Sequence, residues 1–144
     1  MAITQALPNS FKKQLLDGDQ DFSSAGGDTF KLALYVSTAT LGAATTSYTA
    51  SGEVSNVGTG YTTTGKALVN SGTSLVSTVA FTDFADLSFT SVTLTARGCL
   101  IYNTSFSNSA VAVLNFGADK TATSGTFTIQ FPAFTSSAAI IRIS

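Results

Sequence analysis

The sequence predicts an all-β protein: an antiparallel β-sandwich or jelly roll of about eight to ten short strands, with a short N-terminal helix or arm. Three observations lead to this prediction. Ser91–Asn103 has the two-residue period of an extended strand. Further short apolar stretches are separated by turns rich in Gly, Ser and Thr. No helical pattern alternates with these stretches, which argues against a parallel α/β fold.

Composition limits the classes of function. The 144 residues suffice for one domain, and a formal net charge of −1 without a Lys/Arg cluster argues against binding to nucleic acid. One cysteine and no histidine exclude an internal disulfide and histidine-based catalysis or metal binding. No apolar run is long enough to cross a membrane. The first residues lack the basic and apolar regions of a secretory signal, so we expect folding in a cytoplasm.

Met1–Asp21 carries the helical pattern, and we expect residues 1–22 to form an N-terminal arm beside a sandwich domain of residues 23–144. Asn9 or Ser10 can cap the helix, and Gly18 ends it. Its apolar stripe consists of Phe11, Leu15 and Leu16. Because a helix of two turns is unstable alone, it docks either on its own β-core or, as an arm, on a partner or neighbouring subunit.

The expected strands follow one another with short connections. The earlier ones are Thr29–Ser37, short strands around Tyr48 and Val54, Lys66–Asn70 and Leu75–Asp83. The later ones are Ser91–Asn103, Ala110–Phe116, Thr126–Phe131 and Ala139–Ile143. We expect Phe84–Phe89 to be irregular and Gly117–Gly125 to be a turn-rich loop. Val57–Gly65, with glycines around Tyr61, is expected to be a long surface loop that contacts a partner.

Four aspartates have the spacing of a calcium-binding loop: Asp17, Asp19, Asp21 and Asp28. Phe22 stands where such a loop needs glycine, and Asp28 stands where it needs glutamate. A solvated acidic turn after the helix is therefore the favoured interpretation, and we expect no metal and no other cofactor.

No group of residues predicts catalysis. Cys99 is a lone thiol in a strand that we expect to be buried, and the chain has no histidine to activate it. Glu53 is the only glutamate, and no second acid is spaced to form a glycosidase pair with it. The four tyrosines are scattered along the sequence and outline no sugar-binding groove. We therefore expect a protein that acts by contact and not as an enzyme.

The stretches Cys99–Tyr102 and Ala110–Leu114 are apolar on both faces, although the outer face of a sandwich strand is usually polar. Either the N-terminal helix or another subunit covers this outer face. The residues expected in a subunit interface there are Cys99, Ile101, Val111 and Val113. The residues expected to contact another partner are Phe11, Leu15, Leu16 and Tyr61.

A series of different short motifs extends over nearly the whole chain. The first ones are Asn9–Lys12, Leu15–Gly18 and Gly27–Tyr35. The later ones are Gly58–Tyr61, Ala85–Asp86, Ala96–Asn103, Phe116–Lys120, Ser124–Gly125 and Ala139–Ile143. With these motifs the sequence resembles small β-rich structural proteins of tailed bacteriophages, similar to capsid cement and decoration proteins.

The resemblance implies a virion component. Proteins of this kind clamp neighbouring capsomers through buried interfaces, often as trimers at local three-fold axes. We therefore expect a capsid cement or decoration protein on the capsid surface, made in the host bacterial cytoplasm. Its expected partners are the major capsid protein and, in a homotrimer, its own copies. A tail, neck or fibre-associated structural protein is the first alternative, and a carbohydrate-binding adhesin module is the second.

Overall fold

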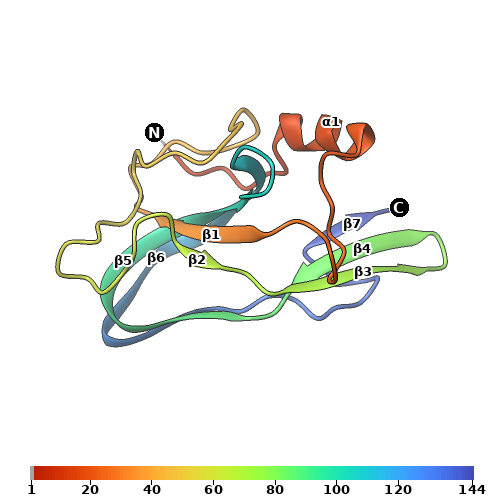
Figure 1. Cartoon of the computed structure of the whole chain (residues 1–144). Coiled ribbons are helices and arrows are strands. Elements are labelled where there is room, and N and C mark those ends of the chain that lie inside the picture. Colours follow the sequence, from red (N-terminus) through yellow and green to blue (C-terminus); the bar gives the residue numbers. More distant parts are fainter. Residues whose placement is uncertain (1) are drawn as a thin grey trace.

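The computed structural model describes residues 2–144, which form one short helix and seven strands in two sheets (Figure 1). The helix is α1 (Asn9–Asp17). The strands are β1 (Phe30–Tyr35), β2 (Lys66–Ala67), β3 (Asn70–Val76), β4 (Val79–Phe84), β5 (Leu87–Asn103), β6 (Ser109–Ile129) and β7 (Ile141–Ile143). One sheet has the order β2-β1-β5-β6 and the other the order β3-β4-β7, with antiparallel pairs throughout. The prediction of an antiparallel all-β fold with one short helix is confirmed.

β6 is much longer than the sequence predicted and β5 begins somewhat earlier, so residues 2–144 hold fewer strands than expected. β5 has 17 residues and β6 has 21. The expected loop Gly117–Gly125 lies inside β6, because β5 runs beside it and supplies its hydrogen bonds. Thr95, for example, pairs with Thr121 in the backbone register, and their hydroxyl oxygens lie 2.8 Å apart. A paired neighbour therefore overrides the weak strand preference of a stretch that begins and ends with glycine and contains Asp and Lys.

β5 and β6 form a long two-stranded ribbon that bends over on itself (Figure 1). The pairing register shifts repeatedly along the ribbon, and such irregularities bend and twist a strand pair. The ring centroids of Phe116 and Phe127 lie 6.1 Å apart, although both residues belong to β6. A straight strand rises about 3.3 Å per residue and would hold these rings far apart. The inner side of the bent ribbon therefore encloses part of the core.

The chain covers both faces of β1 and β5 by itself. Leu34 and Ile101 lie in the main core, whereas Tyr35 and Leu100 lie in a second cluster on the opposite face. Further members of the second cluster are Ile3, Ala39 and Leu41. They come from the segment before α1 and from the connection after β1. The apolar outer face is thus covered by these two segments, and not mainly by the helix or by another subunit as the sequence led us to expect.

α1 lies on the β-core of its own chain. Phe11 is fully buried in the main core, and Gly18 ends the helix with a left-handed backbone at φ +81°. The expectation that Asn9 or Ser10 caps the helix is wrong. Pro8 occupies the capping position, and its side chain has no polar atom that could make a capping hydrogen bond.

The expected boundary at residue 22 does not separate two structural units. Ile3 and Phe22 are both buried, one in each cluster. The backbone of Ala6 also pairs with that of Val113 in β6, with N–H to O distances of 3.1 and 2.9 Å. Residues 2–22 are therefore part of the sandwich and not an arm that extends from it.

Candidate functional site: an apolar groove beside the three-stranded sheet

The four residues expected in a subunit interface lie inside the single chain. Cys99, Ile101, Val111 and Val113 have no exposed surface, so they cannot contact another subunit in this fold. They also do not share one face. The register between β5 and β6 shifts next to Ile101, so Val111 enters the main core while Val113 enters the second cluster. Burial raises the pKa of the Cys99 thiol, which keeps it protonated and unreactive.

The residues expected to contact another partner have different environments. Phe11 and Tyr61 are buried, and Leu15 packs partly against the main core. Leu16 alone among them is open to solvent, with 91% of its surface exposed. The expected surface loop around Tyr61 therefore turns inward. The hydroxyl of Tyr61 accepts a hydrogen bond from the amide of Leu34 at 3.0 Å, inside the sheet.

The four tyrosines, scattered along the sequence, come together around Glu53. Tyr48 and Tyr61 donate hydrogen bonds to its two carboxylate oxygens at 2.6 and 2.7 Å, and the amide of Thr64 donates a third at 2.8 Å. Two further tyrosine hydroxyls tie the same connection between β1 and β2 to the sheet. They belong to Tyr35, bonded to the carbonyl of Thr49, and Tyr102, bonded to that of Thr64.

This cluster has a structural role, because it holds the connection between β1 and β2 to the sheet. Burial, followed by the hydrogen bond to Glu53, raises the pKa of Tyr48 and of Tyr61. Their hydroxyls therefore stay protonated and remain donors to Glu53. Every polar group named here already has a partner, which leaves little free hydrogen-bonding capacity for a ligand.

The aspartates of the possible calcium loop do not converge. Asp17 pairs with Lys13 on the helix surface, and one oxygen of Asp28 accepts hydrogen bonds from the amide of Asp21 and the side chain of Asn103. No group of three or more metal-binding side chains lies together within residues 2–144. The segment after α1 is thus an acidic turn held to the β5–β6 connection.

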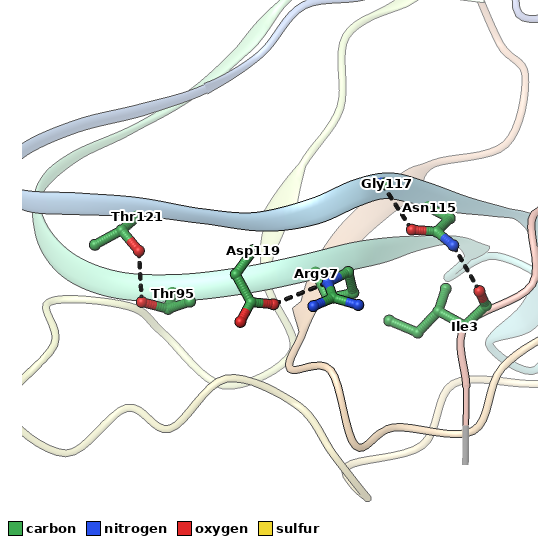
Figure 2. Close-up of polar contacts among 7 residues, drawn as sticks. All are labelled: Ile3, Thr95, Arg97, Asn115, Gly117, Asp119 and Thr121. Carbon is green, nitrogen blue, oxygen red and sulfur yellow. Dashed lines mark hydrogen bonds and ion pairs between the residues drawn. The ribbon is translucent and has the colours of Figure 1, made fainter.

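The outer side of the bent ribbon is polar. Figure 2 shows Thr95 facing Thr121 and Arg97 facing Asp119 across the two strands, with 2.9 Å between Arg97 Nε and Asp119 Oδ1. Arg97 of β5 therefore pairs with a residue of β6. Such exposed pairs contribute little to the stability of the fold.

A groove of about 330 Å³ lies where α1 faces the three-stranded sheet. Its floor is the sheet face that carries Thr73, Ala80, Thr82, Ile141 and Ile143. Its wall is formed by Leu15 of α1 and by the segment Gln20–Ser23. We call it the α1–β7 groove.

The floor of the groove continues as an exposed apolar row across the sheet. Leu75 of β3 pairs with Ala80 of β4, which in turn pairs with Ile143 of β7. Leu75 is 68% exposed and Ile143 is 56% exposed. On the opposite face Phe134 packs edge-on against Phe81, while Val76 of β3 stays 50% exposed. Large apolar side chains gathered on one open face are typical of a contact surface.

The wall of the groove is acidic. Asp21 lines it, and a hydrogen bond from Ser23 lowers the pKa of Asp21, so its carboxylate is ionised at neutral pH. Asp19 precedes it in the same turn. The C-terminal end of α1, the negative end of the helix dipole, also leads into this wall, and no basic residue lies in its last turn.

Sequence reasoning did not find this site. Leu75 and Ile143 alternate as core residues do, and a two-residue period does not tell whether the apolar face of a strand is covered. The signal present in the sequence was Leu15, which belongs to the apolar stripe of the helix, was expected to contact a partner and lines the groove.

Comparisons with protein-family models, with curated proteins and with solved structures returned no match for this chain. Within residues 2–144, no helix is long and apolar enough to span a membrane.

Asp83 of β4 is a buried carboxyl group away from the groove, with 1% of its surface exposed. One oxygen accepts a hydrogen bond from the amide of Phe84 at 2.9 Å, and the other has no partner within residues 2–144. Burial raises the pKa of Asp83 above its ordinary value of 3.8. The folded chain therefore binds this proton more tightly than the unfolded chain does.

We expect Asp83→Asn to raise the free energy of unfolding by about 1 kcal/mol at neutral pH, because the amide is cheaper to bury than the carboxylate. The gain should shrink as the pH falls through the raised pKa of Asp83 and vanish below its ordinary value of 3.8, where wild-type Asp83 is protonated in both states. Urea unfolding across this range measures the difference, with the exposed Asp119→Asn as control. A gain independent of pH would contradict the prediction.

Proposed function

We propose that this protein is a virion structural protein, a capsid cement or decoration protein that clamps neighbouring capsomers of a tailed-phage head. The observation that carries the proposal is the open apolar face of the three-stranded sheet, in contrast to β1 and β5, whose two faces are covered by the chain itself. The sequence motifs that resemble small phage structural proteins support the same proposal. The partner is then the major capsid protein, and the location is the capsid surface.

Clamping of this kind uses interface burial alone. Complete burial of a large apolar side chain contributes about 1.5–3 kcal/mol. Leu75 and Ile143, each more than half exposed, still have most of this energy to gain from a partner. A head carries hundreds of equivalent sites, so modest energy at each site adds up to a substantially stronger shell.

The expected homotrimer remains part of the proposal, but its contacts have to come from exposed residues. Light scattering after size-exclusion chromatography measures the state in solution. A trimer that persists on dilution supports assembly at three-fold axes. A monomer contradicts the trimer and implies that each copy binds the shell separately.

Heads assembled without this protein test the proposed function. We expect the purified chain to bind such heads in hundreds of copies and to raise the temperature at which they release DNA. Quantitative mass spectrometry counts the copies, and electron microscopy of labelled protein locates them. Binding of only a few copies at the neck or tail would overturn the cement function in favour of the tail alternative.

A further inference from the structure

We infer that the α1–β7 groove binds an extended segment of a partner protein that presents large apolar side chains next to lysine or arginine. The inference deepens the proposed function, on which it rests for the partner being a virion protein. It follows from the shape, the apolar row and the charge of the groove.

The size of the groove fits side chains and not a whole domain. Its volume of about 330 Å³ is at the low end of the roughly 300–1,000 Å³ typical of ligand sites. The apolar row of Leu75, Ala80 and Ile143 runs across three strands and leads into the groove. A partner segment lying along this row buries two or three apolar side chains, which is the usual way a few anchors supply most of the binding energy.

The charge of the groove favours basic residues next to those apolar side chains of the partner. Asp21 lines the groove, and none of the residues described as lining it is a lysine or an arginine. Lys13 of α1 is paired with Asp17, so its positive charge is already balanced. The negative end of the helix dipole and the carboxylate of Asp21 together make the electrostatic potential of this wall negative. A cation placed next to the apolar anchors therefore gains attraction at this wall.

The same charge argues against a second copy of the chain as the occupant. Two copies joined face to face through this sheet would each contribute the same acidic wall, and neither groove has a basic lining residue to pair with Asp21 of the other copy. Like charges at an interface core disfavour association. A partner of opposite charge meets no such penalty.

Two synthetic peptides test the inference, one of alternating leucine and lysine and one of alternating leucine and glutamate. Fluorescence anisotropy measures their binding to the full chain at low and high salt. We expect the lysine peptide to bind at least about tenfold more tightly and to weaken as salt rises. Equal binding of both peptides would overturn the charge argument and with it the inference.

Variants place the binding on the groove. We expect the double variant Leu75→Ser and Ile143→Ser to weaken the lysine peptide about tenfold or more, and Asp21→Asn to weaken it several-fold with a smaller salt dependence. Val57→Ser is the matched control, since Val57 is an exposed apolar residue away from the groove and should leave binding unchanged. Thermal unfolding of each variant verifies that it is folded.

The remaining outcomes are also decisive. Unchanged binding in the folded double variant would overturn the inference. A wild-type dimer that the double variant dissociates would show that a second copy occupies the groove, and would overturn it as well. Because the peptide assay needs no heads, failure of the chain to bind heads would reject the proposed function while leaving the groove as a peptide site.

Discussion

Glu53→Ala is expected to lower the free energy of unfolding by about 4 kcal/mol. The carboxylate of Glu53 accepts hydrogen bonds from Tyr48, Tyr61 and the amide of Thr64. Alanine removes all three and leaves a buried tyrosine hydroxyl and a backbone N–H without an acceptor. Each buried group left without a partner costs about 1–3 kcal/mol, and Tyr48, which reaches solvent, costs less than the others. Urea unfolding followed by tyrosine fluorescence measures the change.

Two variants control this experiment. Glu53→Gln keeps one carbonyl oxygen for Tyr61 and Thr64 and should cost about 1 kcal/mol. Asp119→Ala removes an exposed ion pair with Arg97 and should cost about 0.5 kcal/mol or less. If Glu53→Ala unfolds at the same urea concentration as the wild type, the cluster does not hold the connection between β1 and β2 to the sheet.

Gly65→Ala is expected to destabilise the fold by more than about 4 kcal/mol, enough to leave much of the chain unfolded. Gly65 has φ +82°, and a Cβ atom there would lie 1.9 Å from the carbonyl oxygen of Leu32. That oxygen cannot move away, because Leu32 belongs to β1, which is paired on both sides by β2 and β5. Far-ultraviolet circular dichroism and the soluble yield report the loss of structure.

Gly58→Ala separates steric conflict from backbone strain. Gly58 also has a positive φ, +69°, but a Cβ atom there would meet nothing within 4 Å. Its substitution should lower the free energy of unfolding by only about 1 kcal/mol, because alanine is less stable than glycine in a left-handed backbone. Equal stability losses at the two positions would mean that contact with Leu32 is not the reason why residue 65 is glycine.

The fold class could be predicted because alternation is a local property of the sequence. β1 and the first strand of the long ribbon were expected in almost the right places, since their own side chains dictate an extended chain with buried faces. The continuity of β6 through Gly117–Gly125 could not be predicted, because those residues become a strand only when β5 lies beside them. The register shift next to Val111 is likewise a property of the pair of strands.

The candidate site was beyond sequence reasoning for a related reason. The tyrosines around Glu53 meet because residues 36–65 fold back on the sheet, which depends on contacts between distant parts of the chain. The apolar row exists because Leu75 and Ile143 are left exposed within residues 2–144. A sequence pattern of apolar residues looks the same whether the strand face is covered or open. Conversely, Cys99 and Ile101 looked available for an interface because the sequence of β5 is apolar on both faces there, and it does not show that the chain itself covers both.

Because Cys99 is buried, its labelling by a thiol reagent can report rare openings of the core. Its sulfur has no exposed surface and lies between β1 and β6, both paired to β5. A thiol reagent therefore reacts only during the brief intervals in which these strands separate, and the labelling rate reports how often that happens. As this is the one thiol of the chain, the signal needs no assignment. Slower labelling after the protein joins a larger assembly would reveal that contact at the surface stiffens the interior.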